Sequence, residues 1–321
     1  MTTTILSDVL ETPIRTPIPE AEVTEYLNSA PFLPIANALN LRTVTSLTLP
    51  PNLIFRSGSL AHLPATTLTS LKQTYNITTI FDLRSSQEKE KSPNPEVDGI
   101  ENVWIPSTVD FGSQVRGERG ASAQGAEDSK LDGSHQPARL SPSDFAQNEG
   151  VDGYVKLYGH FLETHRDAYR AVFEKLKDSE SSGILFHCNA GKDRTGVLAA
   201  LILALMHSVP EEISRDYALT RIGIEPFREY LLKSLLQQMG KTPDDETFSE
   251  PGMEAICGTR GDTILALLEW MDGKWGAFSA EQDQSDKKGA FTGVEGYLIE
   301  RLGFDKEEVE KIKSRLARKA S

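Results

Sequence analysis

The apolar residues of this chain fall into short β-branched runs and longer stretches with helical spacing. Residues 53–58, 77–83, 103–106 and 184–186 form short apolar runs, most of them next to Gly, Pro or polar residues, and this pattern predicts four strands. Helical spacing recurs on both sides of the last strand. The predicted helices cover residues 68–75, 151–177, 195–207, 211–220, 226–238, 262–271 and 305–317.

The order of these elements predicts an α/β fold. Strands and helices alternate in the first half and helices dominate the second, so we expect one central sheet flanked by helices with a helical C-terminal half. Residues 1–30 are rich in Thr and Pro and are interpreted as an N-terminal arm on a domain spanning 31–321. Residues 107–150 contain few large apolar side chains and are predicted to be a flexible insertion. Residues 275–289 form a second polar loop.

Composition and charge narrow the function classes. The formal net charge is −13, which argues against a nucleic-acid partner because a broad basic face would be needed. The chain has two cysteines, so a disulfide framework is not supported. No apolar run reaches the length of a membrane span, and the N-terminus lacks the pattern of a secretory signal. We therefore expect a cytoplasmic protein, with the nucleus left open as a second location.

The most informative segment is the ten residues from His187 to Gly196. Cys188 and Arg194 stand six positions apart, after a predicted buried strand and before an apolar helix. A loop that runs from a strand into a helix N-terminus directs backbone N–H groups into one concavity, which suits a phosphate group. The same groups stabilise a thiolate, so Cys188 is expected to be a nucleophile near neutral pH.

The other residues of this loop have separate expected tasks. The planar guanidinium of Arg194 can hold two phosphoryl oxygens. The Thr195 hydroxyl could donate to the cysteine sulfur and improve it as a leaving group, while His187 is expected to order the loop. The expected phosphate-binding set is Asn189, Ala190, Gly191, Lys192, Asp193 and Arg194.

This motif resembles the phosphate loop of the protein tyrosine/serine phosphatases of bacteria and fungi, within the cysteine-phosphatase superfamily. Further segments are similar in the same order, namely Asn40-Leu41-Arg42, Phe55-Arg56-Ser57-Gly58, Phe81-Asp82-Leu83-Arg84-Ser85 and Asp216-Tyr217-Ala218-Leu219-Thr220. The resemblance implies a central sheet flanked by helices and no metal or other cofactor. It also implies activity on phosphotyrosine and, in some relatives, on phosphoserine, phosphothreonine or phosphoinositides.

Hydrolysis of a phosphate ester requires a general acid, and three aspartates are candidates. Asp193 within the loop is the candidate that the resemblance implies, Asp82 at a strand end is the second, and Asp110 is the third. Arg56 is left between a pocket-lining role and pairing with a carboxylate. Cys257 is interpreted as a buried apolar residue.

The sequence thus predicts a cysteine-dependent phosphatase that acts through a phosphocysteine on Cys188. Phosphotyrosine on protein is the preferred substrate, and Lys192 keeps a phosphoinositide as an alternative. A phosphate-recognition module without turnover and a sulfur or arsenate transferase are the rival classes.

Overall fold

The computed structural model describes residues 6–108, 140–178, 182–242, 244–278 and 291–317. Within them, five strands form one sheet in the order β1-β2-β5-β3-β4. Only β1 runs antiparallel to its neighbour, and the other three pairings are parallel. The strands are β1 (Arg42–Thr43), β2 (Ile54–Ser57), β3 (Ile77–Asp82), β4 (Glu101–Trp104) and β5 (Gly183–His187). This confirms the predicted α/β class.

The central strand β5 is buried on both faces, as expected for a parallel sheet covered by helices. Its side chains alternate, so that Ile184 and Phe186 belong to the large core cluster on one face. Leu185 belongs to a smaller cluster with Leu68 and Leu71 on the other face. The two faces therefore carry cores of very different size, and the site-bearing helices pack on the larger one.

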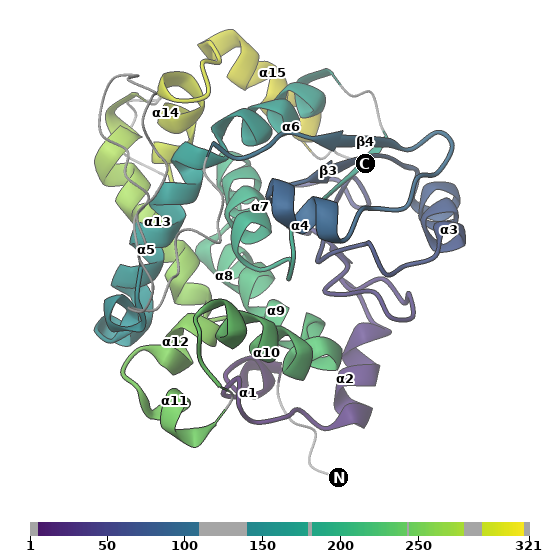
Figure 1. Cartoon of the computed structure of the whole chain (residues 1–321). Coiled ribbons are helices and arrows are strands. Elements are labelled where there is room, and N and C mark those ends of the chain that lie inside the picture. The colour runs from purple at the N-terminus through teal and green to yellow at the C-terminus, as the bar shows by residue number, and fades with distance from the viewer. Residues whose placement is uncertain (1–5, 109–139, 179–181, 243, 279–290, 318–321) are drawn as a thin grey trace, which may run out of the picture.

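The helices surround the sheet unequally (Figure 1). The smaller face packs against α3, whereas the larger one packs against a group that includes α5, α6 and α7. The α-helices are α1 (Leu6–Leu10), α2 (Glu20–Leu27), α3 (Ala65–Tyr75), α4 (Ser86–Lys91), α5 (Val151–Thr164), α6 (Arg166–Asp178), α7 (Asp193–Leu205), α8 (Pro210–Ala218), α9 (Thr220–Gly223), α10 (Arg228–Gln238), α11 (Asp245–Ser249), α12 (Met253–Cys257), α13 (Gly261–Trp275), α14 (Gly293–Glu300) and α15 (Lys306–Leu316).

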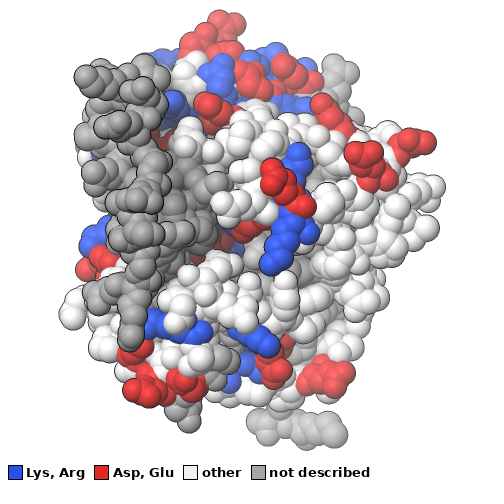
Figure 2. All heavy atoms as spheres, viewed as in Figure 1, with Lys and Arg blue, Asp and Glu red and all other residues white. Residues whose placement is uncertain are grey.

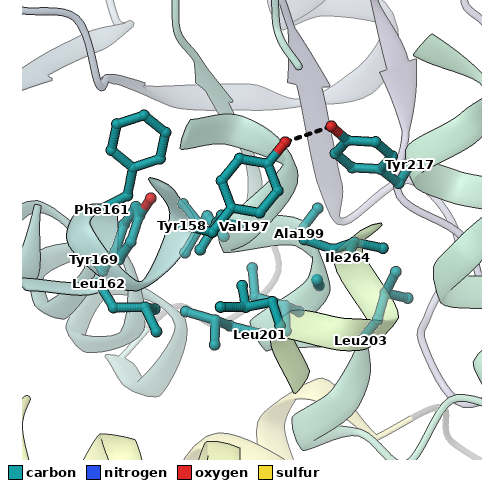
Figure 3. Packing of buried hydrophobic residues seen from close by; sticks show 14 of the residues in the cluster. Tyr158, Phe161, Leu162, Tyr169, Val197, Ala199, Leu201, Leu203, Tyr217 and Ile264 are labelled. Carbon is teal, nitrogen blue, oxygen red and sulfur yellow. Dashed lines mark hydrogen bonds between the residues drawn. The ribbon is translucent and has the colours of Figure 1, made fainter. Parts of the chain in front are cut away.

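Helix α7 forms the centre of the larger core. From Arg194 to Leu205 all of its residues are buried, because α5, α8, α13 and α14 surround it. Figure 3 shows Val197, Ala199, Leu201 and Leu203 packed among side chains of neighbouring helices. A helix that is apolar on all sides is stable only inside a protein, so this packing fixes the loop that precedes it.

Two predicted segments differ from the structure. The helical stretch predicted over 151–177 is interrupted at His165, which has φ −107° and ψ 16° and separates α5 from α6. The end of the predicted insertion is folded, with short 3-10 helices at Pro142–Phe145 and Asn148–Gly150. Phe145 is buried and makes an edge contact with Tyr154, which explains why this part is ordered. Residues 109–139 of the predicted insertion and 279–290 of the second loop lie outside the described residues.

The N-terminal arm contains α1 and α2 and packs against α9. Its residues Val9, Ile18 and Val23 form a small core with Leu219 and Ile222. Acidic and basic side chains are interspersed over the face shown in Figure 2. Among the described helices, none combines the length and the apolar character that crossing a bilayer requires.

Candidate active site

Cys188 lies where the polypeptide leaves β5, and α7 begins at Asp193. The Cys188 side chain is buried and lines a cavity of about 130 Å³ together with Asp193 and Arg194. The walls of this cavity are largely apolar and come from α5, α10, α12 and the N-terminal arm. The predicted strand–loop–helix arrangement is therefore present, with the nucleophile candidate inside a pocket.

The carbonyl groups of the loop are all bound on one side. The donors of these hydrogen bonds belong to other segments of the chain and to the start of α7. Ser59 N donates to Asn189 O (2.8 Å), Asn40 Nδ2 to Ala190 O (3.2 Å), Arg56 Nη2 to Gly191 O (2.8 Å) and Gly196 N to Lys192 O (2.7 Å). Because these carbonyls are bound by groups of the protein, we infer that the loop N–H groups face the cavity, as an anion-binding concavity requires. Gly191 allows this turn, since its φ is +69° and a Cβ would lie 2.5 Å from the Ser57 carbonyl.

A buried charged group supports the loop from behind. Arg42 and Arg56 are fully buried and both pair with Asp216, while Asn40 holds the loop carbonyls. Burial and repulsion from Arg56 lower the pKa of Arg42 to about 9, so its side chain still carries charge at neutral pH. The group therefore has one positive charge in excess directly behind the loop. Arg56 thus pairs with a carboxylate and supports the loop at the same time.

Arg194 is held in position by Glu88 of α4. The two guanidinium nitrogens Nη1 and Nη2 donate to the Glu88 carboxylate at 2.6 and 3.0 Å, and Nη1 also donates to Leu83 O at 3.1 Å. Glu88 is itself fixed because it forms a capping box with Ser85 at the start of α4. Burial alone would raise the pKa of Glu88, but the charge of Arg194 and the bonds to Arg194 and Ser85 lower it to about 2.

We expect the Glu88→Gln variant to lose stability in a pH-dependent manner. A carboxylate whose pKa is lower in the folded state stabilises the protein above its ordinary value of 4.5, and this contribution is lost as the pH falls towards 2. The difference in unfolding free energy at pH 7 has an upper bound of about 3 kcal/mol. Urea unfolding at pH 7 and at stepwise lower pH should show the gap between the two proteins narrowing below pH 4.5. A constant gap would contradict this account.

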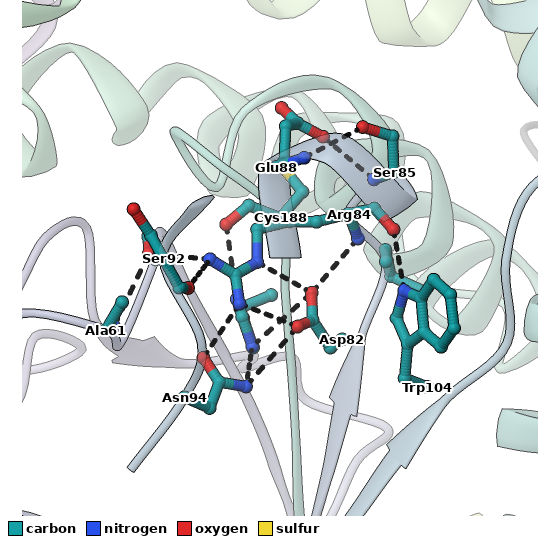
Figure 4. A network of polar contacts seen from close by, with 12 residues as sticks. Ala61, Asp82, Arg84, Ser85, Glu88, Ser92, Asn94, Trp104 and Cys188 are labelled. Carbon is teal, nitrogen blue, oxygen red and sulfur yellow. Dashed lines mark hydrogen bonds and ion pairs between the residues drawn. The ribbon is translucent and has the colours of Figure 1, made fainter. Parts of the chain in front are cut away.

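Asp82 lies in a buried polar network beside the loop (Figure 4). Both of its carboxylate oxygens accept bonds from Arg84, with Nε at 2.8 Å and Nη2 at 2.7 Å. Asn94 Nδ2 lies 2.8 Å from Nε2 of His187, and His187 Nδ1 lies 3.2 Å from the Cys188 carbonyl oxygen. Burial is the main cause that lowers the pKa of His187, which keeps its ring neutral at pH 7. Asp82 is not among the residues that line the cavity.

Asp193 and Lys192 contact a cluster of tyrosines. Tyr158 Oη donates to Asp193 Oδ1 at 2.8 Å and also contacts the hydroxyl of Tyr217 (Figure 3). Lys192 Nζ lies 2.9 Å from Tyr154 Oη and 3.5 Å from Asp193 Oδ1. Burial of Lys192 lowers the pKa of its ammonium group, but the nearby charge of Asp193 is the main cause that raises this pKa above its ordinary value. Asp193 is among the residues that line the cavity.

The remaining predicted residues lie as follows. Among the described residues, the buried Thr195 hydroxyl has no hydrogen-bond partner, so the expected bond to the Cys188 sulfur is not formed in this structure. Cys257 is buried as expected, and burial raises the pKa of its thiol to about 11. It also lines the cavity, which the sequence did not indicate. Asp110 lies outside the described residues.

Sequence reasoning missed Glu88, Asn94 and the tyrosines that contact the loop. Glu88 carried one usable signal, because Ser85 followed three residues later by Glu is the pattern of a capping box at a helix start. Tyr154 and Tyr158 lie in the helix predicted over 151–177 and are buried, and their hydroxyls contact Lys192 and Asp193, respectively. In the part of the chain that the structure describes, no group of three or more His, Cys, Asp or Glu side chains is arranged to hold a metal ion.

Comparison with known proteins identifies the class to which this site belongs. Residues 33–280 match the model of the tyrosine phosphatase family. The chain therefore belongs to the tyrosine phosphatase family, a class of phosphate-ester hydrolases.

Three relatives bear this out. The chain is 30% identical over 224 residues to a putative tyrosine-protein phosphatase of Cupriavidus necator, covering 70% of each protein. It is 26% identical over 255 residues to the triple specificity protein phosphatase PtpB of Mycobacterium tuberculosis, covering 76% of this chain and 90% of that protein. It is 28% identical over 165 residues to a tyrosine-protein phosphatase of Nostoc commune, covering 51% of this chain and about half (48%) of that protein.

Proposed function

We propose that this protein hydrolyses phosphotyrosine on proteins through a phosphocysteine intermediate on Cys188. The observation that carries the proposal is the position of Cys188 at the cavity, at the start of a loop whose carbonyls accept hydrogen bonds from other groups of the protein. An inward-facing set of N–H groups at the start of α7 stabilises both the thiolate and the bound phosphate.

The reaction proceeds in two displacements. The Cys188 thiolate attacks phosphorus, so a sulfur–phosphorus bond forms while the bond to the ester oxygen breaks, and that oxygen takes a proton from the general acid. A water molecule then gives its proton to the same residue and attacks phosphorus. Phosphate leaves and the thiolate is restored. Arg194 and the loop N–H groups stabilise the charge on the equatorial oxygens in both steps.

Asp193 is the general acid in this proposal. It lines the cavity, whereas Asp82 has both oxygens bound to Arg84 and does not line it. Asp82 instead acts as a positioning residue that fixes Arg84 beside His187. The neutral His187 bridges Asn94 and the Cys188 backbone, which supports the expected loop-ordering role.

The size of the cavity favours an aryl phosphate. A cavity of about 130 Å³ is close to the roughly 150 Å³ apolar cavity that holds one benzene ring in an engineered protein. Lys192 is buried beneath Tyr154, with its ammonium group also bonded to Ile256 O and Gly258 O. It is therefore already engaged and poorly placed to bind additional phosphates of an inositol ring.

A substrate panel tests both the substrate class and the acid. Phosphate release is measured for wild type and Asp193→Asn with phosphotyrosine, phosphoserine and phosphothreonine peptides, p-nitrophenyl phosphate and phosphorylated inositol lipids. We expect wild type to have its highest kcat/KM with phosphotyrosine peptides. A higher kcat/KM for an inositol lipid would overturn the substrate assignment.

The Asp193→Asn variant is expected to lose about 10²- to 10⁴-fold in kcat on phosphoserine and phosphotyrosine, because their leaving oxygens need a proton. The kcat of Asp193→Asn should fall much less on p-nitrophenyl phosphate, whose leaving group departs without taking up a proton. Equal losses on all substrates would contradict the assignment of Asp193 as the acid. The matched variant Asp82→Asn should show no such dependence on the leaving group.

A further inference from the structure

The N-terminal arm contributes a residue to the catalytic cavity. Ile14 lines the cavity together with Cys188 and belongs to the same core cluster. The match to the family begins at residue 33, so this wall of the pocket lies outside the part of the chain that the family model covers. The neighbouring arm residues Val9 and Ile18 are also buried, but they belong to a separate cluster away from the cavity.

The backbone around Ile14 is fixed to the helices that follow the active-site loop. Arg221 donates to three arm carbonyls, Thr12 O at 2.9 Å, Pro13 O at 3.3 Å and Thr16 O at 2.6 Å. Arg228 Nη1 reaches Ile14 O at 3.5 Å, and Arg221 and Arg228 are both paired with Glu225. Because these side chains are buried or nearly so, the arm is anchored at several points on both sides of Ile14.

Ile14 is one of the apolar side chains that make up most of the cavity wall, which also includes the polar residues Arg228, Ser234 and Gln238 of α10. The apolar part of the wall also includes Leu231 and Leu235 of α10 and Leu157 and Phe161 of α5. A mostly apolar wall favours a flat hydrocarbon ring over a polyol, most of whose hydroxyls would lack hydrogen-bond partners there, which costs binding free energy.

We infer that Ile14 is a specificity-determining residue, which packs against the ring of an aryl phosphate and so makes the N-terminal arm part of the substrate site. This inference rests on the proposed function. The arm acts on the organic part of the substrate, while the loop from Cys188 to Arg194 acts on the phosphate. Ile14 therefore contributes to binding of the ring and leaves the chemical step at phosphorus unchanged.

Two substitutions of equal size separate a substrate contact from a structural contact. Ile14→Ala and Ile18→Ala remove the same atoms from buried arm positions, but only Ile14 lines the cavity. We expect Ile14→Ala to raise KM for a phosphotyrosine peptide about tenfold with kcat nearly unchanged. The KM for a phosphoserine peptide should change less than threefold. Ile18→Ala should leave both KM values within twofold of wild type.

A third variant keeps the inference testable if Ile14→Ala does not fold. Ile14→Trp fills the cavity, so kcat/KM for the phosphotyrosine peptide should fall at least tenfold while inorganic phosphate still binds with wild-type affinity in calorimetry. Equal losses on both peptides in Ile14→Ala, or the same losses in Ile18→Ala, would overturn the inference. So would unchanged KM in Ile14→Ala. If wild type itself releases no phosphate from phosphotyrosine, the proposed function fails instead.

Discussion

Replacing Cys188 with serine is expected to reduce kcat on phosphotyrosine by a factor on the order of 10⁶. A serine hydroxyl at this position stays protonated near neutral pH, so the loop no longer holds an anionic nucleophile. The loop amides and Arg194 are unchanged, so the variant should still bind phosphotyrosine peptide. Steady-state phosphate release and calorimetric binding measure the two properties separately.

Cys257→Ser is the matched control for this prediction. Both cysteines are buried and line the same cavity, but burial raises the pKa of the Cys257 thiol to about 11, which keeps it protonated. We therefore expect the Cys257→Ser variant to retain turnover. If Cys188→Ser kept substantial activity, or if Cys257→Ser lost it to the same extent, the assignment of Cys188 as nucleophile would be wrong.

Replacing Arg194 with lysine is expected to lower kcat/KM about a thousandfold while the charge is conserved. The guanidinium of Arg194, a residue that lines the cavity, is held in a fixed position by two bonds to Glu88 and one to Leu83 O. A lysine ammonium is a point charge that cannot contact two phosphoryl oxygens in one plane. The loss should appear in kcat as well as in KM, since the charge on those oxygens is redistributed in the transition state.

Arg228→Lys provides the comparison for Arg194→Lys. Arg228 also lines the cavity, but it pairs with Glu225, which is not among the residues that line the cavity. We expect Arg228→Lys to change kcat far less than Arg194→Lys does. A kcat of Arg194→Lys within tenfold of wild type would contradict the proposed role of the guanidinium.

The central part of the fold was predictable because its signals are local. The apolar run before Cys188 and the apolar helix after Arg194 are contiguous in sequence, and they correspond to β5 and α7. The segments containing Arg56 and Asp216 were recognised only by their order along the chain. The structure shows why both segments contribute to the site, because the side chains of Arg56 and Asp216 form an ion pair beneath the loop.

The residues that sequence reasoning missed depend on contacts between distant segments. Glu88 and Arg194 are separated by 106 positions, and the pairing follows from the adjacency of β3 and β5 in the sheet. Arg221 and the arm carbonyl of Thr12 are separated by 209 positions. Periodicity predicted the helical stretch that contains Tyr158, but it carries no information about which carboxylate a buried hydroxyl contacts. Such pairings follow from tertiary packing.

The central claim is a covalent phosphate on Cys188, and rapid acid quenching tests it most directly. Wild type is mixed with an excess of phosphotyrosine peptide, quenched in acid within milliseconds and digested, and the peptide containing Cys188 is examined by mass spectrometry. The account predicts an acid-stable phosphate on Cys188 in wild type and none in Cys188→Ser. Phosphate release by wild type with no phosphorylated Cys188 at any quench time, or with phosphate on another residue, would contradict it.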